Sequence, residues 1–192
     1  ISDNAITGNA AEAEPQGQVG ESLGHGGGVH IFAFEDFSQG CNSIVSARVE
    51  DNVITGNTSR NLNSSPQAVR YRAQGGGVWA STAMEPGGTA LIRIMGKEIS
   101  GNGPTVDTPA SAGGGIFATT RADGFGVETI LIEDNTIGPD NRSHEGGGIA
   151  AWAVSSPDGD HHIEIVKNEI KDNTGFSTSS VGAGRGASLR VE

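Results

Sequence analysis

The chain is poor in the features that hold most globular domains together. It has one cysteine, Cys41, among 192 residues, so no disulfide can form within the chain. Aromatic residues make up 5% and apolar residues 34%, which is little for a compact two-layer core. No apolar run has the length of a membrane span, so we do not expect a membrane-spanning segment.

Basic residues are also scarce. The chain carries 12 Lys and Arg against 23 Asp and Glu, for a formal net charge of -11. An acidic surface repels phosphate backbones, so nucleic acid is not an expected partner.

Glycine, by contrast, is plentiful, with 31 residues, and much of it lies in repeated phrases. The phrase "DNAITGN" at 3–9 returns as "DNVITGN" at 51–57. Looser copies are "GKEISGN" at 96–102, "DNTIGPDN" at 134–141 and "KNEIKDN" at 167–173. A second phrase, "GGGV" or "GGGI", starts at Gly26, Gly75, Gly113 and Gly146, with a degraded copy "GRGA" at Gly184. A fixed skeleton with variable spacing is typical of repeat architectures.

Apolar residues fall into columns when the units are aligned on these phrases. Positions two residues apart are apolar within each unit, which predicts short strands with one buried face. Helix is disfavoured, because the period is two and Gly or Asn interrupts every candidate turn. The columns are Ile6, Ile54, Ile99, Ile137 and Ile170; Ile1, Val49, Ile94, Ile132 and Ile165; Ala47, Ile92, Ile130 and Ile163; Val29, Val78, Ile116, Ile149 and Ala187; and Ile31, Ala80, Ala118, Ala151 and Leu189.

A strand that returns with the same buried face can stack on its own copy. We therefore predict an all-β chain, a parallel β-helix (β-solenoid) of about five coils spaced about 4.8 Å apart. We expect residues 1–192 to form a single parallel β-helix domain, which could be a segment of a longer solenoid. We also expect asparagines to take the left-handed conformation at bends and to form hydrogen-bonded ladders along the stack, with Lys97 as an exception. In the second ladder, the fourth unit supplies either Asp140 or Asn141. The triple glycines are expected at a crowded corner.

The alternation of "GGG[VI]" with "DN.I.GN" resembles the right-handed parallel β-helix repeats of pectate-lyase-like proteins. It is similar also to the Gly-Gly-rich repeats of polymorphic outer-membrane proteins and other bacterial surface β-helices. The resemblance covers essentially the whole chain and implies a right-handed fold. Among its enzymes it implies a site on an outward strand face or flanking loops, with clustered Asp and often calcium. It does not specify function, because this fold hosts lyases, hydrolases and adhesins.

The loops that follow the glycine strands carry carboxylates, among them Glu128. The densest stretch is "SPDGDHH" at 156–162, where Asp158 and Asp160 could supply oxygen ligands to calcium. The alternative is a solvated Pro-Asp-Gly turn without a metal. His161 and His162 are adjacent on an expected strand, so they should point to opposite faces.

Two large aromatics are expected on the outward face of the glycine strands. Trp79 and Phe117 would lie one coil apart, as a stacking platform for a sugar ring. The alternative is that a loop or a neighbouring chain covers them, and we expect this cover.

The sequence contains no recognisable catalytic set, and we expect neither hydrolase nor lyase activity. An extracellular or cell-surface scaffold, structural or adhesive, is the favoured function. Its partners would be copies of itself or adjoining solenoid coils stacked end to end, because Ile1 and the final "ASLRVE" both lie within strands of the pattern. The alternatives are a polysaccharide-active enzyme and a carbohydrate-binding module.

Overall fold

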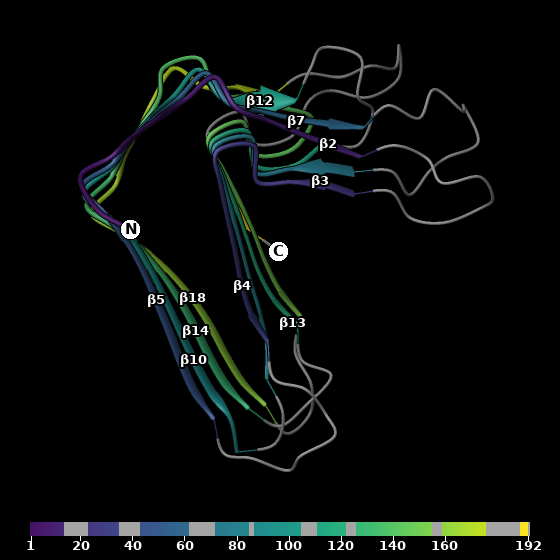
Figure 1. The fold of residues 1–192 in the computed structure, drawn as a ribbon, viewed down its shortest axis with the longest axis vertical. Coiled ribbons are helices and arrows are strands. Elements are labelled where there is room, and N and C mark those ends of the chain that lie inside the picture. The colour runs from purple at the N-terminus through teal and green to yellow at the C-terminus, as the bar shows by residue number, and fades with distance from the viewer. Residues whose placement is uncertain are drawn as a thin grey trace, which may run out of the picture.

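The computed structural model describes residues 1–13, 23–34, 43–61, 72–84, 87–104, 111–121, 126–154, 159–175 and 189–191. These residues form an all-β structure in which every strand pair is parallel, and none of them is helical. Strands of successive repeat units lie over one another, so the outline of one unit returns in the next (Figure 1). Units 1 to 5 begin at the "DN" phrase and its copies, at residues 3, 51, 96, 134 and 167, and each unit runs to the next copy.

Three sheets make up the body of the molecule. The first, called here the corner sheet, follows each "DN" phrase and consists of β1 (Ala5–Thr7), β6 (Val53–Thr55), β11 (Glu98–Ser100), β15 (Thr136–Ile137) and β19 (Glu169–Ile170). The glycine sheet consists of β4 (Val29–Phe34), β9 (Val78–Ala83), β13 (Ile116–Arg121), β17 (Ile149–Val154) and β21 (Leu189–Val191). The long sheet consists of β5 (Ile44–Glu50), β10 (Thr89–Met95), β14 (Val127–Glu133) and β18 (Asp160–Val166).

Shorter strands complete the units beside these sheets (Figure 1). One small sheet contains β2 (Ala10–Ala13), β7 (Thr58–Asn61) and β12 (Gly103–Pro104). Two pairs are formed by β3 (Leu23–His25) with β8 (Arg72–Gln74), and by β16 (Arg142–Ser143) with β20 (Thr174–Gly175).

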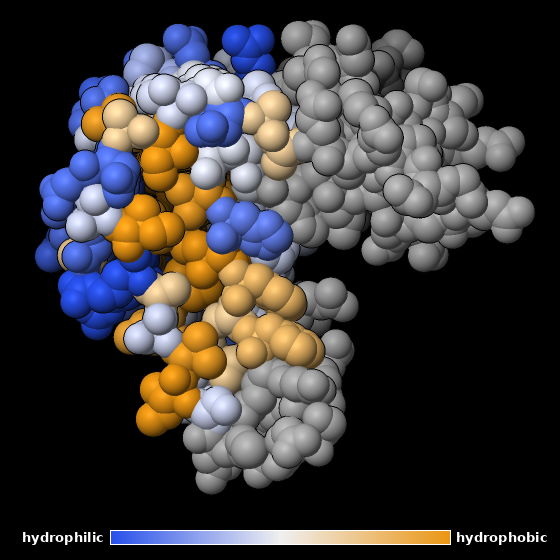
Figure 2. All heavy atoms as spheres, viewed as in Figure 1, coloured by the Kyte–Doolittle hydropathy of each residue, from blue (hydrophilic) through white to orange (hydrophobic). Residues whose placement is uncertain are grey.

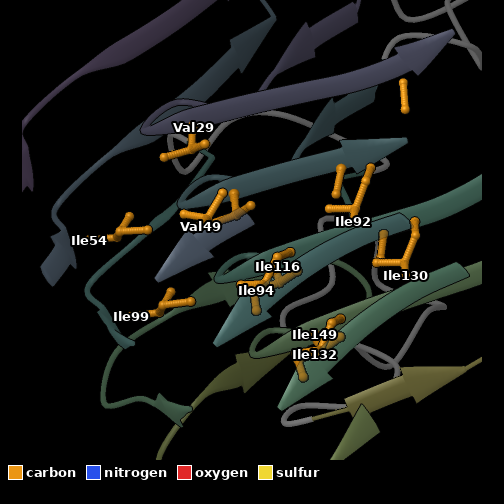
Figure 3. Packing of buried hydrophobic residues seen from close by; sticks show 14 of the residues in the cluster. Val29, Val49, Ile54, Ile92, Ile94, Ile99, Ile116, Ile130, Ile132 and Ile149 are labelled. Atoms are coloured by element: carbon orange, nitrogen blue, oxygen red, sulfur yellow. The ribbon is translucent and has the colours of Figure 1, made fainter. Parts of the chain in front are cut away.

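The predicted apolar columns are confirmed as stacks of paired residues. Ile6, Ile54, Ile99, Ile137 and Ile170 pair in register along the corner sheet, and the middle three are fully buried. The long sheet aligns Val49 with Ile94, Ile132 and Ile165 in the same way. Figure 3 shows side chains from the three sheets pointing into the shared interior. The interior is therefore narrow and continuous, which explains how few apolar residues suffice.

The last strand of the glycine sheet departs from the predicted register. Leu189 pairs with Ile149, and Val191 pairs with Ala151. We expected Ala187 opposite Ile149 and Leu189 opposite Ala151, so that assignment is wrong by two residues. The degraded phrase "GRGA" departs from the triple glycine of the other copies, so it did not set the same offset to the strand that follows. The phrase at Gly184 lies outside the described residues.

Both asparagine ladders are present. Asn9 Nδ2 donates to Asn57 Oδ1, Asn57 Nδ2 to Asn102 Oδ1, and Asn102 Nδ2 to Asn141 Oδ1, at 3.0 to 3.1 Å. Asn141 Nδ2 then donates to Asn173 Oδ1 at 2.9 Å, so Asn141 rather than Asp140 occupies the fourth position. The other ladder joins Asn4 to Asn52 and Asn135 to Asn168, with Lys97 between the two pairs.

The expected backbone conformation of these asparagines is wrong. The residue before each asparagine position takes the positive φ instead, at 49–67°. Asp3, Asp51, Gly96, Asp134 and Lys167 precede the first ladder, and Gly8, Gly56, Gly101, Asp140 and Asp172 precede the second. The neighbour makes the bend, and the asparagine side chain is left free to bond along the stack.

The triple glycines form crowded corners, as predicted. The first glycine of each described copy has a φ near +60°. In the copies that begin at Gly26, Gly75 and Gly113, a Cβ on the second or third glycine would meet backbone oxygens of neighbouring units. At Gly115, for example, a Cβ would lie 2.6 Å from the Gly148 carbonyl oxygen. Only glycine fits this corner.

Candidate functional site

The outward face of the glycine sheet carries the aromatic residues that the sequence singled out. Trp79 and Phe117 are in-register partners on β9 and β13, as expected. Their rings belong to a small cluster with Ala112 and Ala150, separate from the main core. Both rings are covered, with Trp79 7% and Phe117 1% exposed. Trp79 also donates from Nε1 to Gln74 Oε1 at 3.2 Å, which holds its ring in place.

Aromatic contacts extend this cluster in both directions along the sheet. His30 of unit 1 meets Trp79 edge-on, with ring centroids 4.4 Å apart, and burial lowers the pKa of this histidine. Trp152 of unit 4 meets Phe117 in the same manner at 4.8 Å. Phe32 lies 6.0 Å from Trp79 and is about half exposed. In this cluster the Phe32 ring is therefore accessible to solvent, whereas the rings of Trp79 and Phe117 are buried.

The predicted calcium ligands are only partly described. Asp158 lies outside the described residues. Asp160 is exposed at the start of β18, where its Oδ1 lies 2.7 Å from His162 Nε2. No group of three or more His, Cys, Asp or Glu side chains within the described ranges is arranged to hold a metal ion.

The two neighbouring histidines point to opposite faces, as predicted. His162 is on the solvent side with Asp160, whereas the His161 side chain is 3% exposed and lies against Glu128. His161 and Glu128 are in-register partners of β18 and β14. This places a histidine and a carboxylate together inside the stack.

Glu128 was expected among the exposed carboxylates of a loop, and this expectation is wrong. It is the second residue of β14, and its inward side chain is fully buried. Glu128 Oε2 accepts from Thr82 Oγ1 at 2.7 Å, and Oε1 accepts from the Met84 backbone N–H at 2.6 Å. The sequence did contain the signal, because Glu128 lies two residues before Ile130 of an inward column.

Lys97 is a second buried ionisable group. It is 2% exposed, and its Nζ has no hydrogen-bond partner. Burial lowers the pKa of this lysine to about 8, although the negative charges of Asp51, Glu50 and Asp3 act in the opposite direction. Burial disfavours the charged form, and this effect outweighs the acidic neighbours.

The described part of the chain contains no helix long and apolar enough to cross a membrane. No protein-family model matches the chain, and comparison with the curated proteins and the solved structures finds no significant match.

Proposed function

We propose that the chain is a right-handed parallel β-helix that serves as an extracellular scaffold, structural or adhesive, and continues end to end with further coils. The observation that carries this proposal is the unbroken in-register parallel stacking of equivalent strands from unit to unit. Such a stack is stabilised by contacts between neighbouring units, so a further unit with the same strands can add at either end.

The hydrogen-bonded side chains support a role as a rigid rod. Ladder asparagines bond to the equivalent residue of the next unit, except at the step from Asn52 to Lys97, and several also bond to backbone carbonyls, such as Asn102 Nδ2 to Ile54 O at 2.8 Å. These bonds run along the stack and resist separation of the units. A ladder in which each amide both donates and accepts adds stiffness that apolar packing alone would not supply.

The first unit presents an open face that another coil would fit. Ile6, Ile31, Val45 and Ala47 are only partly buried, whereas their counterparts Ile54, Ala80, Ala90 and Ile92 in unit 2 are fully buried. Among the described strands, each strand of the first unit pairs with one other strand, and β5 is bridged in addition at Glu50 by Ser2. Figure 2 shows apolar atoms gathered over the positions of the glycine and long sheets, with hydrophilic residues at the rim. Unpaired strands beside apolar columns favour addition of a like coil, from a second copy or from adjoining sequence.

The test is self-association of the chain of 192 residues. We expect sedimentation velocity to show larger species as concentration rises, and electron microscopy to show rods one stack wide. The edge strand β5 provides a blocking variant. The Glu50 N–H and the Arg48 carbonyl face Ile1, so strand alternation places the Ser46 N–H on that same open edge.

Ser46→Pro removes this N–H without removing a bond to β10, and it should reduce association. Ser46→Ala keeps the N–H and is the matched control, expected to associate as the unmodified chain does. A chain that stays monomeric at high concentration would contradict end-to-end stacking. So would equal association of the proline and alanine variants.

Carbohydrate binding is a second candidate, favoured by one observation. Phe32 and Phe34 are each about half exposed, and their rings stack with centroids 5.5 Å apart beside Trp79. Adjacent exposed aromatics suit the apolar face of a sugar ring. Titration with a panel of neutral and acidic oligosaccharides, with Phe32→Ala as the control, tests this candidate. It is abandoned if no sugar alters the tryptophan fluorescence or the heat of mixing.

A further inference from the structure

The outward face of the long sheet serves neither the scaffold proposal nor the aromatic cluster. The long sheet forms one side of the molecule (Figure 1). Ile92, Ile94 and Ile130 point from it into the interior (Figure 3), so the residues between them point outward. Each of its strands has seven residues, which gives four outward positions on each of four strands in register.

Several outward residues of this face are apolar and open to solvent. Three are 83%, 43% and 40% exposed, at Ile44, Val127 and Val166. Those nearer the middle of the face are partly exposed. Apolar residues gathered on one exposed face indicate an interaction surface. The full apolar set is Ile44, Leu91, Met95, Val127, Leu131 and Val166.

The apolar set has two-fold symmetry. A half-turn about an axis through the centre of the face reverses the order of the strands and the direction along each strand. It takes the first outward position of β5 to the last of β18, and the second of β10 to the third of β14. Every apolar residue of the face then falls on the position of another. The exchanged pairs are Ile44 with Val166, Leu91 with Leu131, and Val127 with Met95.

We propose that this face binds a second copy of the chain about that two-fold axis, to form a lateral dimer. In a two-fold contact the same patch serves both copies, so it must be complementary to itself. Here Leu91 packs on Leu131 of the second copy at the centre, and the other apolar pairs meet around them. The contact uses the side of the stack, so it is separate from stacking at the ends.

The charges of the face favour the same arrangement. Arg48 and Arg93 lie on it in units 1 and 2, whereas Glu133 and Glu164 lie on it in units 3 and 4. The half-turn places Glu164 of the second copy over β5, near Arg48 and Arg93. Within the described part of the chain, neither Arg93 nor Glu164 forms an ion pair, so both can pair between copies. Opposite charges brought together in this way fix the orientation of a contact.

One exchange at the rim joins like charges. The half-turn sets Glu50 against Asp160 of the second copy. Glu50 already forms an ion pair with Arg48, and Asp160 lies 2.7 Å from His162, so each carboxylate has a basic neighbour of its own. These neighbours reduce the repulsion at the rim.

The size of the face sets the strength of the dimer. Four strands of seven residues span about 14 by 20 Å, less than the roughly 800 Å² that each partner buries in a standard interface. Each chain also carries a net charge of -11. We therefore expect a weak dimer that forms at high concentration, and single stacks in dilute samples.

Sedimentation velocity over a range of concentrations measures the dimer. Leu131→Glu places a carboxylate at the centre of the contact and should weaken pairing by about 10-fold or more. Val53→Glu adds the same charge on the corner sheet, where Val53 is 41% exposed, and is the matched control. It should pair as the unmodified chain does.

Cross-linking separates lateral pairing from stacking at the ends. Cys41→Ser removes the single native thiol. In that background, chains with Leu91→Cys are mixed with chains with Leu131→Cys and treated with a short bifunctional maleimide. The half-turn brings these two positions together, so the mixture should cross-link well and each variant alone poorly.

Both leucines point outward, so these changes leave the core intact, and circular dichroism checks the fold. The proposal is overturned if Leu131→Glu pairs as strongly as Val53→Glu. It is overturned as well if the mixture cross-links no better than either variant alone, and the face then belongs to a different partner. Rods that form despite these results would retain the scaffold and exclude only the lateral contact.

Discussion

At the scale of single residues, Lys97 is the clearest departure from the repeat. Its backbone N–H donates to Asn135 Oδ1 at 3.1 Å, as an asparagine at this position would. Its side chain has no acceptor to offer Asn52 of the unit before, and its own Nζ is buried without a hydrogen bond. The main chain thus follows the ladder while the side chain interrupts it.

Replacing Lys97 with asparagine should complete the ladder. The new amide can accept from Asn52 and donate to Asn135, and the buried ammonium group is removed. We expect Lys97→Asn to raise the free energy of unfolding by about 1–2 kcal/mol, measured by denaturant titration. Lys97→Ala, which removes the ammonium group and supplies no amide, is the control. Equal stability of the two variants would show that the ladder bond contributes nothing.

The same lysine predicts a pH dependence. Its pKa is about 8 when folded and 10.5 in the unfolded chain, so between these values the unfolded state binds more protons. Stability must then rise with pH across this window. We expect the difference in unfolding free energy between Lys97→Asn and the unmodified chain to shrink from pH 8 to pH 10.5. A difference that stays constant would mean that Lys97 titrates as an exposed lysine does.

The stability lost when a core isoleucine is truncated should depend on the unit in which it lies. Ile99 lies fully buried in the middle of its column, so Ile99→Ala leaves a cavity that the stack cannot close. We expect a loss of about 2–5 kcal/mol in the free energy of unfolding. Ile6→Ala, in the same column but partly exposed in unit 1, should cost distinctly less. Similar losses at both positions would contradict the open first unit.

At the scale of elements, the corners fix where each strand starts and ends. A residue with positive φ precedes every ladder position, and a triple glycine precedes β4, β9, β13 and β17. Gly103 also has a positive φ, and a Cβ there would contact Arg142 of the next unit. Backbone at these corners is packed against backbone, so side chains are excluded by contact as well as by conformation.

The two reasons for glycine can be separated by mutation. Gly114 has no positive φ, but a Cβ there would lie 2.5 Å from the Gly147 carbonyl oxygen. Gly8 has a φ of 67° and open space around it. We expect Gly114→Ala to cost about 1–3 kcal/mol through crowding, and Gly8→Ala about 1 kcal/mol through conformation alone. Thermal unfolding of both variants measures this, and a larger loss at Gly8 would refute the crowding argument.

At the scale of the whole molecule, stability should be graded along the stack. The ladder and column residues of the middle units are fully buried, whereas Ile6 and Ile170 in units 1 and 5 are not. Each unit touches only its neighbours, so outer units lack one stabilising interface.

Amide hydrogen exchange should reveal this gradient. We expect the slowest exchange in β10, β11 and β14 and the fastest in β1 and β19, because local opening begins where one interface is missing. Association end to end would slow exchange at the outer strands as concentration rises. Uniform protection in dilute solution would indicate one cooperative block.

The sequence by itself determined the strands and their inward columns. Period-two apolar residues at fixed offsets from "DN" and "GGG" must stack when identical units pair in parallel, and this placed Ile54, Ile99 and Ile137 correctly. Only the tertiary structure decided what lies across a loop of variable length. Such loops change the number of residues between a repeated phrase and the next strand. For this reason the repeats left the choice between Asp140 and Asn141 open and placed Leu189 two residues out of register. They also assigned Glu128 to a surface loop. The pairing of Glu128 with His161 arises because parallel register joins residues that the chain keeps far apart.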